Sequence, residues 1–365
     1  MRATPVILFG AFDRHNLGDL LFPHVLAARY AGRPVYHAGL AERDMSAYGG
    51  HRVIAMQQVP DILCGQTAEV VHVGGELLTC DAYAAAVMLQ TPEAARDAIR
   101  RYDALPAERD AWVVRVLGTT RHAPYVLDKR LLPWCSRMTF HCVGGVGFRD
   151  CPAAMRQEVL AALRHADAVT VRDRRTLGQL GHSGIAAILQ RDAVADIARY
   201  FGERIREHQG RGEVLACAEA FPDGYLAVQF AAEYGDDATL SQLAQGIAHL
   251  AGDRLGVVMF RAGAAPWHDD LESYRRLAKE LSTPFRMFES LNVWDICALL
   301  AGARAHLGSS LHGHIIARAF GVPALGLERK NGAGAKLSAW YETWEANGSF
   351  TMVTPGQVAK LSWRI

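Results

Sequence analysis

Long apolar runs and an excess of one charge are both missing from this 365-residue sequence. No run reaches the ~18–20 apolar residues that cross a bilayer, so we expect no membrane-spanning helix. The sequence carries 39 lysines and arginines against 38 aspartates and glutamates, and no basic run is interleaved with aromatic residues. Because nonspecific nucleic-acid binding depends on clustered positive charge, this composition argues against nucleic acid as a partner.

The seven cysteines form no CxxC pair, the spacing typical of structural zinc sites. Cys135, His141, Cys142 and Cys151 lie near one another, but adjacent His141 and Cys142 would point to opposite faces of a strand. We therefore expect buried thiols and no bound metal. Scattered cysteines in odd number are typical of reduced thiols, and the apolar run at 6–10 is too short for a secretory signal. These features predict a cytoplasmic protein.

Short apolar strands alternate with amphipathic helical runs along nearly the whole chain. This alternation is typical of α/β layers built on parallel sheets. A polar, glycine-containing segment at about 203–213 lacks apolar periodicity, and we interpret it as an interdomain linker. The sequence predicts two Rossmann-like doubly wound domains facing a cleft. We expect them to span residues 1–205 and 206–365, with a C-terminal helix that can pack back on the first domain.

Two predicted strands end in glycines, in "AEVVHVGGELL" at 68–78 and "MTFHCVGGVGF" at 138–148. Ligands in open α/β sheets bind at the carboxyl ends of the strands, where glycine lets the backbone approach. We expect the site to include Gly74, Gly75 and Gly144. The second segment contains GGxG but lacks the GxGxxG spacing and the later acidic residue of a dinucleotide site, so we expect no Rossmann cofactor.

The segment "GSSLHGHIIARAFGVP" at 308–323 places two serines and two histidines at the start of an apolar helix. Serine before an apolar periodic run is a helix N-cap signal. The free amides and the dipole of a helix N-terminus also attract anions. The segment is therefore either a capped helix with an incidental histidine pair or an anion site beside a titratable group. His312 and His314 face directions roughly 200° apart on a helix, so only one can belong to such a site.

Other polar residues after predicted strands allow two interpretations each. Asp13, Asn16 and Asp19 in "GAFDRHNLGDLL" either cap the first helix and shape its turn or bind a ligand, and a cap is the expected role. Arg172 and Asp173 follow the strand "AVTV". They form either an ordinary ion pair or a site in which the planar guanidinium binds carboxylate or phosphate.

The order of these motifs resembles the polysaccharide pyruvyl transferase family over nearly the whole chain. The resemblance is carried by "NLGD", "VGGELL", "VTVRDRRTLGQLGHSG", "QRDAVADIA", and "GSSLHGHIIARAFGVPALGL" followed by "KLSAWYETW". The block SSLHGxIxAxxxGxP is its specific part. Many members carry arginine directly before LHG, where this chain has Ser310. The resemblance implies two Rossmann-like domains of the GT-B kind.

The same resemblance implies transfer of an enolpyruvyl-derived group from phosphoenolpyruvate to a sugar, leaving a pyruvate ketal. The product would be a cell-surface glycan, an exopolysaccharide or its lipid-linked precursor. It implies no cofactor beyond phosphoenolpyruvate as co-substrate, and no metal. His312 is the expected general acid and base, because it has the right type and place. Arg172 is the expected catalytic cation, and the expected donor-binding residues are Ser309, Ser310, Leu311, Gly313 and Lys336.

The acceptor, a glycan or lipid-linked saccharide, is expected on the N-terminal domain. Its hydroxyls would bind Asp13, Asn16, Asp19 and Asp81. A lipid-linked acceptor would bring the protein to the inner face of the membrane as a peripheral protein. Trp134, Trp267 and Trp340 could stack on a sugar, but we expect them in the core. We expect Arg329 and Lys330 to face solvent.

Two other functions fit the same architecture, because a fold does not fix a function. One is a GT-B-type nucleotide-sugar glycosyltransferase, since such enzymes also place diphosphate at helix N-termini. The other is a non-catalytic carbohydrate-binding or complex-assembly member of the family, motivated by Ser310 in place of the arginine. Turnover with phosphoenolpyruvate or with a nucleotide sugar separates these alternatives.

Overall fold

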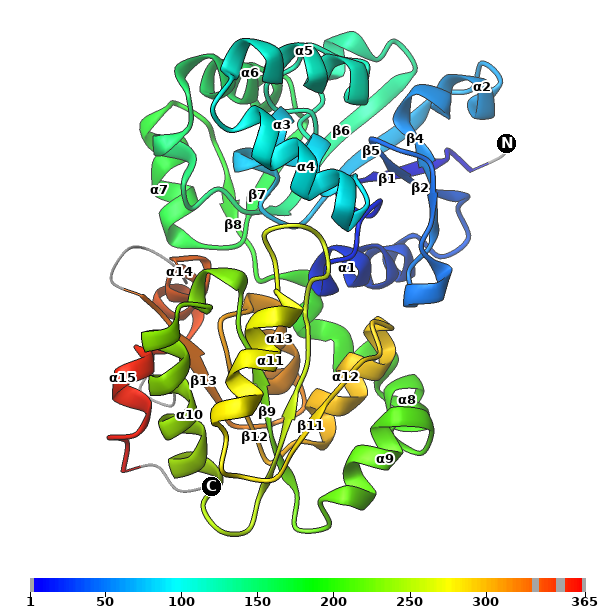
Figure 1. The fold of residues 1–365 in the computed structure, drawn as a ribbon. Helices are drawn as coiled ribbons and strands as arrows, with labels where there is room; N and C mark the ends of the chain where they lie inside the picture. Colours follow the sequence, from blue (N-terminus) through cyan, green and yellow to red (C-terminus); the bar gives the residue numbers. More distant parts are fainter. Residues whose placement is uncertain (1–2, 330–334, 346–351, 363–365) are drawn as a thin grey trace. The chain divides into compact units, whose positions relative to one another are not determined.

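The computed structural model describes residues 3–329, 335–345 and 352–362. The chain divides into two compact units, Met1–Ala193 and Val194–Ile365, and each unit is an α/β domain (Figure 1). The division falls after Ala193, whereas the sequence placed it after residue 205. The expected cleft between the two domains stays a prediction, and each domain is described on its own below.

The first unit contains an eight-stranded sheet of order β3-β4-β2-β1-β5-β6-β7-β8. All neighbouring strands are parallel except the pair β3 and β4. The strand order reverses between β1 and β5, which is the switch point where doubly wound sheets bind ligands. The strands are β1 (Val6–Phe9), β2 (Val35–Gly39), β3 (Arg43–Asp44), β4 (Arg52–Ala55), β5 (Ala68–Val73), β6 (Cys135–Val143), β7 (Ala168–Val171) and β8 (Ile188–Leu189).

Seven α-helices accompany this sheet within the described residues of the first unit. Strand β1, at the centre of the sheet, is fully apolar and all four of its residues are buried, as expected for a parallel strand covered on both faces. The helices are α1 (Leu17–Ala27), α2 (Val59–Leu63), α3 (Ala82–Met88), α4 (Pro92–Tyr102), α5 (Pro106–Leu117), α6 (Ala153–Arg164) and α7 (Arg174–His182).

The second unit contains a six-stranded parallel sheet of order β11-β10-β9-β12-β13-β14. Its strand order reverses between β9 and β12, so this pair of strands is the second switch point. The strands are β9 (Tyr225–Gln229), β10 (Gly256–Met259), β11 (Phe285–Met287), β12 (Ala305–Gly308), β13 (Ala324–Leu327) and β14 (Met352–Val353).

Helices of the second unit fall into two packed groups. Helix α10 contacts α11 and α15, and α12 contacts α8, α9 and α13. The C-terminal helix α15 thus packs on α10 of its own unit. The helices are α8 (Ile197–Gln209), α9 (Gly212–Ala220), α10 (Asp237–Ala251), α11 (Leu271–Glu280), α12 (Val293–Gly302), α13 (Leu311–Ala319), α14 (Ala335–Trp344) and α15 (Pro355–Val358).

The segment 203–213, which we interpreted as a linker, is helical, so that interpretation was wrong. It belongs to α8 and α9. Helix α8 packs on α12 through a narrow buried stripe that includes Ile205 and His208. His208 Nδ1 lies 2.5 Å from Asp295 Oδ1 of α12. The exposed face of α8 is so polar that its apolar stripe is inconspicuous in the sequence.

Two parallel sheets with reversing strand order confirm the predicted α/β doubly wound architecture. None of the helices in the described ranges combines the length and the apolar character needed to cross a membrane. All seven cysteines are free thiols. Over the same ranges, no group of three or more histidine, cysteine or acidic side chains is arranged to hold a metal ion.

Gly74, at the end of β5, provides a test of how α1 packs on the first sheet. A Cβ at Gly74 would lie 2.4 Å from ring carbons of Phe22, and its φ of +54° disfavours other residues. We expect Gly74→Ala to lose about 1–3 kcal/mol of unfolding free energy more than Gly184→Ala, because it adds overpacking to backbone strain. Gly184 has a φ of +74° and nothing within 4 Å of its added Cβ, so it is the matched control. Equal losses in urea unfolding would contradict the packing argument.

Candidate functional site

Three strand ends of the first sheet meet at a buried ion-pair cluster. Glu76 follows β5, Arg172 follows β7 and Asp192 follows β8. Arg172 Nη2 lies 2.5 Å from Glu76 Oε2, and Arg172 Nη1 lies 3.5 Å from Asp192 Oδ2. Burial opposes the charge on Arg172, but the carboxylates of Glu76 and Asp192 outweigh it and raise the pKa of the guanidinium. Arg172 is therefore a permanent cation that already has two carboxylate partners.

Gly144 follows β6 and leaves the space in which the side chains of Glu76 and Arg172 meet. A Cβ at Gly144 would lie 2.4 Å from Glu76 Oε2 and 2.7 Å from Arg172 Nη2, so a side chain there would separate the pair. Glu76 Oε1 also accepts a hydrogen bond of 2.7 Å from the amide of Val146. The sequence located Gly144 and Arg172 but missed Glu76, although a carboxylate directly after two strand-end glycines was a usable signal. The role of Arg172 at the donor stays a prediction.

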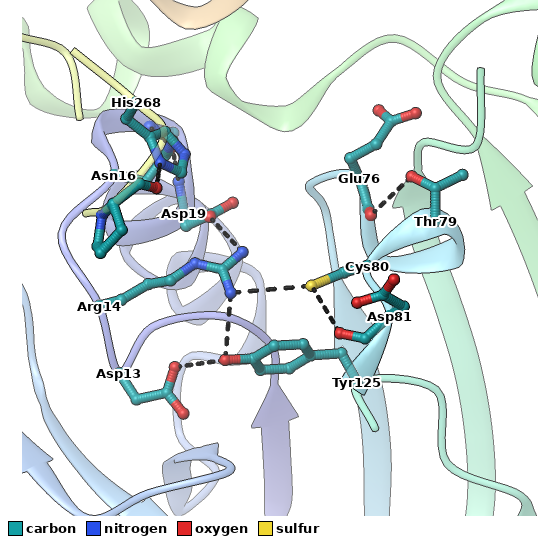
Figure 2. A network of polar contacts seen from close by, with 12 residues as sticks. Asp13, Arg14, Asn16, Asp19, Glu76, Thr79, Cys80, Asp81, Tyr125 and His268 are labelled. Atoms are coloured by element: carbon teal, nitrogen blue, oxygen red, sulfur yellow. Dashed lines mark hydrogen bonds and ion pairs between the residues drawn. The ribbon is translucent and has the colours of Figure 1, made fainter. Parts of the chain in front are cut away.

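A second polar network lies at the switch point of the first sheet, after β1 (Figure 2). Asp13 is fully buried and accepts hydrogen bonds from Tyr125 Oη at 2.8 Å and from the amides of Leu40 and Ala41. Burial raises the pKa of Asp13, against the effects of neighbouring Arg14 and these hydrogen bonds. The guanidinium of Arg14 is 5.2 Å from the centre of the Tyr125 ring. Figure 2 shows these side chains converging on the phenol oxygen.

The four residues expected to bind the acceptor all have structural partners here. Asn16 Oδ1 caps α1 by accepting from the amides of Gly18 and Asp19, so the expected cap is confirmed. Asp81 caps α3 through the amide of Ala84, 2.7 Å away. Asp19 Oδ2 lies 3.8 Å from Arg14 Nη2.

The acceptor contact expected of Asp13 stays a prediction, and the structure shows this carboxylate engaged within the domain. Its exposed fraction is 0 %, and both of its carboxylate oxygens accept hydrogen bonds within the domain. In this conformation a saccharide hydroxyl therefore has no access to this carboxylate. Asn16, Asp19 and Asp81 also stay as predicted acceptor contacts.

The SSLHG segment of the second unit lies where β12 leads into α13. Ser310 is the N-cap, and its hydroxyl accepts from the amide of Gly313 at 3.1 Å, which confirms the predicted cap. Ser309 Oγ accepts from the amide of Ala231 at 3.0 Å. A hydroxyl that accepts a hydrogen bond can still donate its own hydrogen. Both serines can therefore donate to an anion while they hold the turn in place.

Gln229, the last residue of β9, lies beside this turn and was missed by sequence reasoning. Its Oε1 accepts from the amides of Ser309 and Ser310 at 3.2 and 2.8 Å. Its Nε2 donates to Asp269 Oδ1 at 2.8 Å. Burial raises the pKa of Asp269 to about 7, although the N–H groups that it accepts from act in the opposite direction. The contacts of Gln229 span 40 and about 80 residues of sequence, so no local pattern predicts them.

The two histidines of the motif have different surroundings, as their spacing predicted. His312, in the first turn of α13, is 8 % exposed. His314 is fully buried and contacts Tyr341 of α14 through its ring nitrogens, with Glu345 Oε1 3.4 Å away. Burial lowers the pKa of His314, against the effect of Glu345. His314 is therefore a packing residue. Leu311 is buried beside these residues.

His306 explains why glycines flank the turn. It is fully buried in β12, and its Nδ1 lies 3.1 Å from the carbonyl oxygen of Ala227, so Nδ1 carries the hydrogen. Burial lowers the pKa of His306 to about 3, so its ring is neutral. A Cβ at Gly308 or Gly313 would lie 2.8 or 3.2 Å from His306 Nε2. Larger residues at both positions would push against this ring.

The remaining expected residues have mixed outcomes. Lys336 is exposed on α14, and Lys330 lies outside the described residues. Arg329, expected to face solvent, is partly buried. It donates to the carbonyl oxygen of Glu233 and lies 3.2 Å from Asp236 Oδ2.

Trp340 is buried as expected, and Trp134 is partly buried against the core of the first unit. Trp267 is 48 % exposed, so its expected place in the core was wrong.

Solved structures with a similar fold cover nearly the whole chain. The UDP-GlcNAc 2-epimerase from Methanocaldococcus jannaschii has a TM-score of 0.56 and 11 % identity, covering 98 % of this chain and 90 % of that chain. The UDP-GlcNAc 2-epimerase from Neisseria meningitidis bound to UDP-GlcNAc has a TM-score of 0.56 and 12 % identity, with the same coverage. At these identities the likeness shows the fold alone, a GT-B-like fold with two parallel sheets. A comparison with curated proteins gives no match.

A family model described as polysaccharide pyruvyl transferase matches residues 141–331. The match covers more than half of the chain. It includes the end of β6 with Gly144, the cluster residues Arg172 and Asp192, and the whole turn from β12 into α13. The cluster around Arg172 and the SSLHG turn therefore fall largely within the matched segment, and the network around Asp13 lies outside it. The chain belongs to the polysaccharide pyruvyl transferase family.

Proposed function

We propose that this protein transfers the three-carbon unit of phosphoenolpyruvate to two hydroxyls of a saccharide, forming a pyruvate ketal and releasing phosphate. The observation that carries the proposal is the first turn of α13, where two serine hydroxyls able to donate stand beside His312. Family membership supports a transferase that acts on polysaccharides. The acceptor is a cell-surface glycan, an exopolysaccharide or a lipid-linked precursor of one.

The donor is an anion with a phosphate and a carboxylate. The hydroxyl hydrogens of Ser309 and Ser310 and the positive end of the α13 dipole suit such a ligand. Leu311 and Gly313 shape this turn, since Leu311 is buried and Gly313 fits against His306. Lys336 of α14 and Arg172 of the first unit are the proposed cations.

His312 is proposed to move the protons. As a general acid it protonates the methylene carbon of phosphoenolpyruvate, which becomes a methyl group, and a saccharide hydroxyl bonds to the central carbon. A second hydroxyl then bonds to the same carbon as the bond to the phosphate oxygen breaks. The two hydroxyls lose their protons: one returns to His312, and the other goes to the phosphate as it leaves. The net change converts phosphoenolpyruvate and a saccharide diol into a ketal and inorganic phosphate.

His312→Gln is expected to slow turnover by about 10²–10⁴-fold, the usual effect of removing a general acid or base. The fold and donor binding should persist. His314→Gln is the matched control from the same helix; it should cost stability through its contact with Tyr341 and much less turnover. Phosphate release from phosphoenolpyruvate with a saccharide acceptor measures both. Near-normal turnover of His312→Gln would contradict the proposed role.

Arg172→Lys and Glu76→Gln separate a donor contact from a structural ion pair. If Arg172 binds the donor, its lysine variant should raise KM for phosphoenolpyruvate about tenfold, since a planar fork is replaced by a point charge. Glu76→Gln keeps the guanidinium and should leave KM near that of the wild type. A purely structural pair predicts loss of stability in both variants and no selective change in KM.

Chelation gives a third test. Because serine hydroxyls, a helix N-terminus and cations are proposed to bind the donor charge, treatment with EDTA should leave phosphate release unchanged. The control is the same assay with added Mg²⁺. Loss of activity that Mg²⁺ restores would contradict this part of the proposal. Turnover with a nucleotide sugar and none with phosphoenolpyruvate would favour a glycosyltransferase instead.

A further inference from the structure

Three neighbouring strands of the second sheet end side by side, in the order β10, β9 and β12. Asp269 lies in the loop after β10, Gln229 ends β9, and Ser309 and Ser310 follow β12. Hydrogen bonds connect these residues in a line across the strand ends, from the Asp269 carboxylate through the Gln229 amide to the two serine amides. The line crosses the switch point between β9 and β12.

The partners of Asp269 determine which way the Gln229 amide points. Asp269 Oδ2 also accepts from the amides of Ala262, at 2.5 Å, and Gly263, at 3.3 Å. An ionised carboxylate only accepts hydrogen bonds, so the NH₂ group of Gln229 must face it. The amide oxygen of Gln229 must then face the serine N–H groups. Gln229 is 1 % exposed, so water has little access to replace a lost partner.

We propose that Gln229 and Asp269 are positioning residues for the donor-binding turn of α13. Asp269 orients the Gln229 amide, and Gln229 fixes the backbone of Ser309 and Ser310, which sets the direction of both hydroxyls. The polar atoms of the Gln229 side chain are engaged by protein groups, so it acts through the serines and not on the donor. The identity of the donor rests on the proposed function, whereas the effect on the turn does not.

The first test needs no substrate. Gln229→Met keeps the side-chain length and removes both hydrogen-bonding groups. Amide hydrogen exchange should become at least tenfold faster at Ser310 than in the wild type, and less so at Ser309, whose amide keeps the backbone carbonyl oxygen of Gln229 at 3.3 Å. The matched control is Gln209→Met in the same unit, which loses a hydrogen bond of 3.4 Å to Ala298 O but none to the turn. Unchanged exchange at Ser310 in Gln229→Met would overturn the proposal.

The second test is kinetic. Gln229→Met should raise KM for phosphoenolpyruvate at least tenfold while kcat falls less than threefold, and Gln209→Met should change neither. Loss of global stability alone would instead lower the amount of active enzyme in both variants and leave KM unchanged, which would contradict positioning. If the wild type does not turn over phosphoenolpyruvate, the proposed function fails, and the exchange experiment still decides whether Gln229 holds the turn.

Asp269 is tested through pH. Both oxygens of Asp269 accept from N–H groups, and protonation converts one of them into a donor. The Gln229 amide then loses its orienting partner, so KM for phosphoenolpyruvate in the wild type should rise from pH 8 to pH 6. Arg261, His268 and Asp270 in the same loop and Tyr274 of α11 are the other charged or titratable groups near this carboxylate. Asp269→Asn leaves them in place, and its KM should be high at both pH values. The donor phosphate also gains a proton near pH 6, so the rise in KM is compared between the two proteins, and an equal rise in Asp269→Asn would overturn the role of Asp269.

Discussion

Backbone amides that emerge from the end of a parallel strand need acceptors, and the bonds from Ser309 and Ser310 to Gln229 meet that need at the motif. The ladder of β12 ends at Gly308, and α13 begins at Leu311. The Ser309 amide still lies 3.3 Å from the backbone carbonyl oxygen of Gln229, whereas the Ser310 amide is accepted by the Gln229 side chain. Because one side chain on the adjacent strand accepts both, the turn has a defined backbone before any ligand arrives. The N-cap of Ser310 and the placement of His312 depend on that turn.

At the strand ends of each sheet, glycine residues leave space for buried polar side chains. In the first unit, Gly144 lets the pair of Glu76 and Arg172 pass over the end of β6. In the second, Gly308 and Gly313 leave room for the neutral ring of His306 beneath the turn. At Gly144, which the sequence marked as a place of close approach, the space beside the backbone is therefore filled by protein side chains. The glycine allows these supporting contacts to form.

Local patterns predicted much of the fold, including the strand ends, the two helix caps and the different surroundings of the two motif histidines. Asn16 and Ser310 cap the helices that their sequence neighbours indicated. Partners far apart in sequence could not be found in this way. Glu76 reaches Arg172 across 96 residues, and Gln229 reaches the serines across about 80, because the strand order of each sheet brings them together. The amphipathic helix α8 was mistaken for a linker because its exposed face carries most of its residues.

Ser310 stands where the resemblance places an arginine in many members of the family. This difference changes both the charge and the hydrogen bonding of the turn. A guanidinium has no acceptor, so an arginine at this position could not cap the amide of Gly313 as the Ser310 hydroxyl does. The serine thus provides a cap, but the turn has no cation at this position.

Arg172 cannot supply net positive charge by itself, because Glu76 and Asp192 already flank it. Lys336 has no carboxylate partner among the described residues, and its helix packs on α13 through Tyr341 and His314. Of the two proposed cations, Lys336 is therefore the one whose charge no described carboxylate offsets.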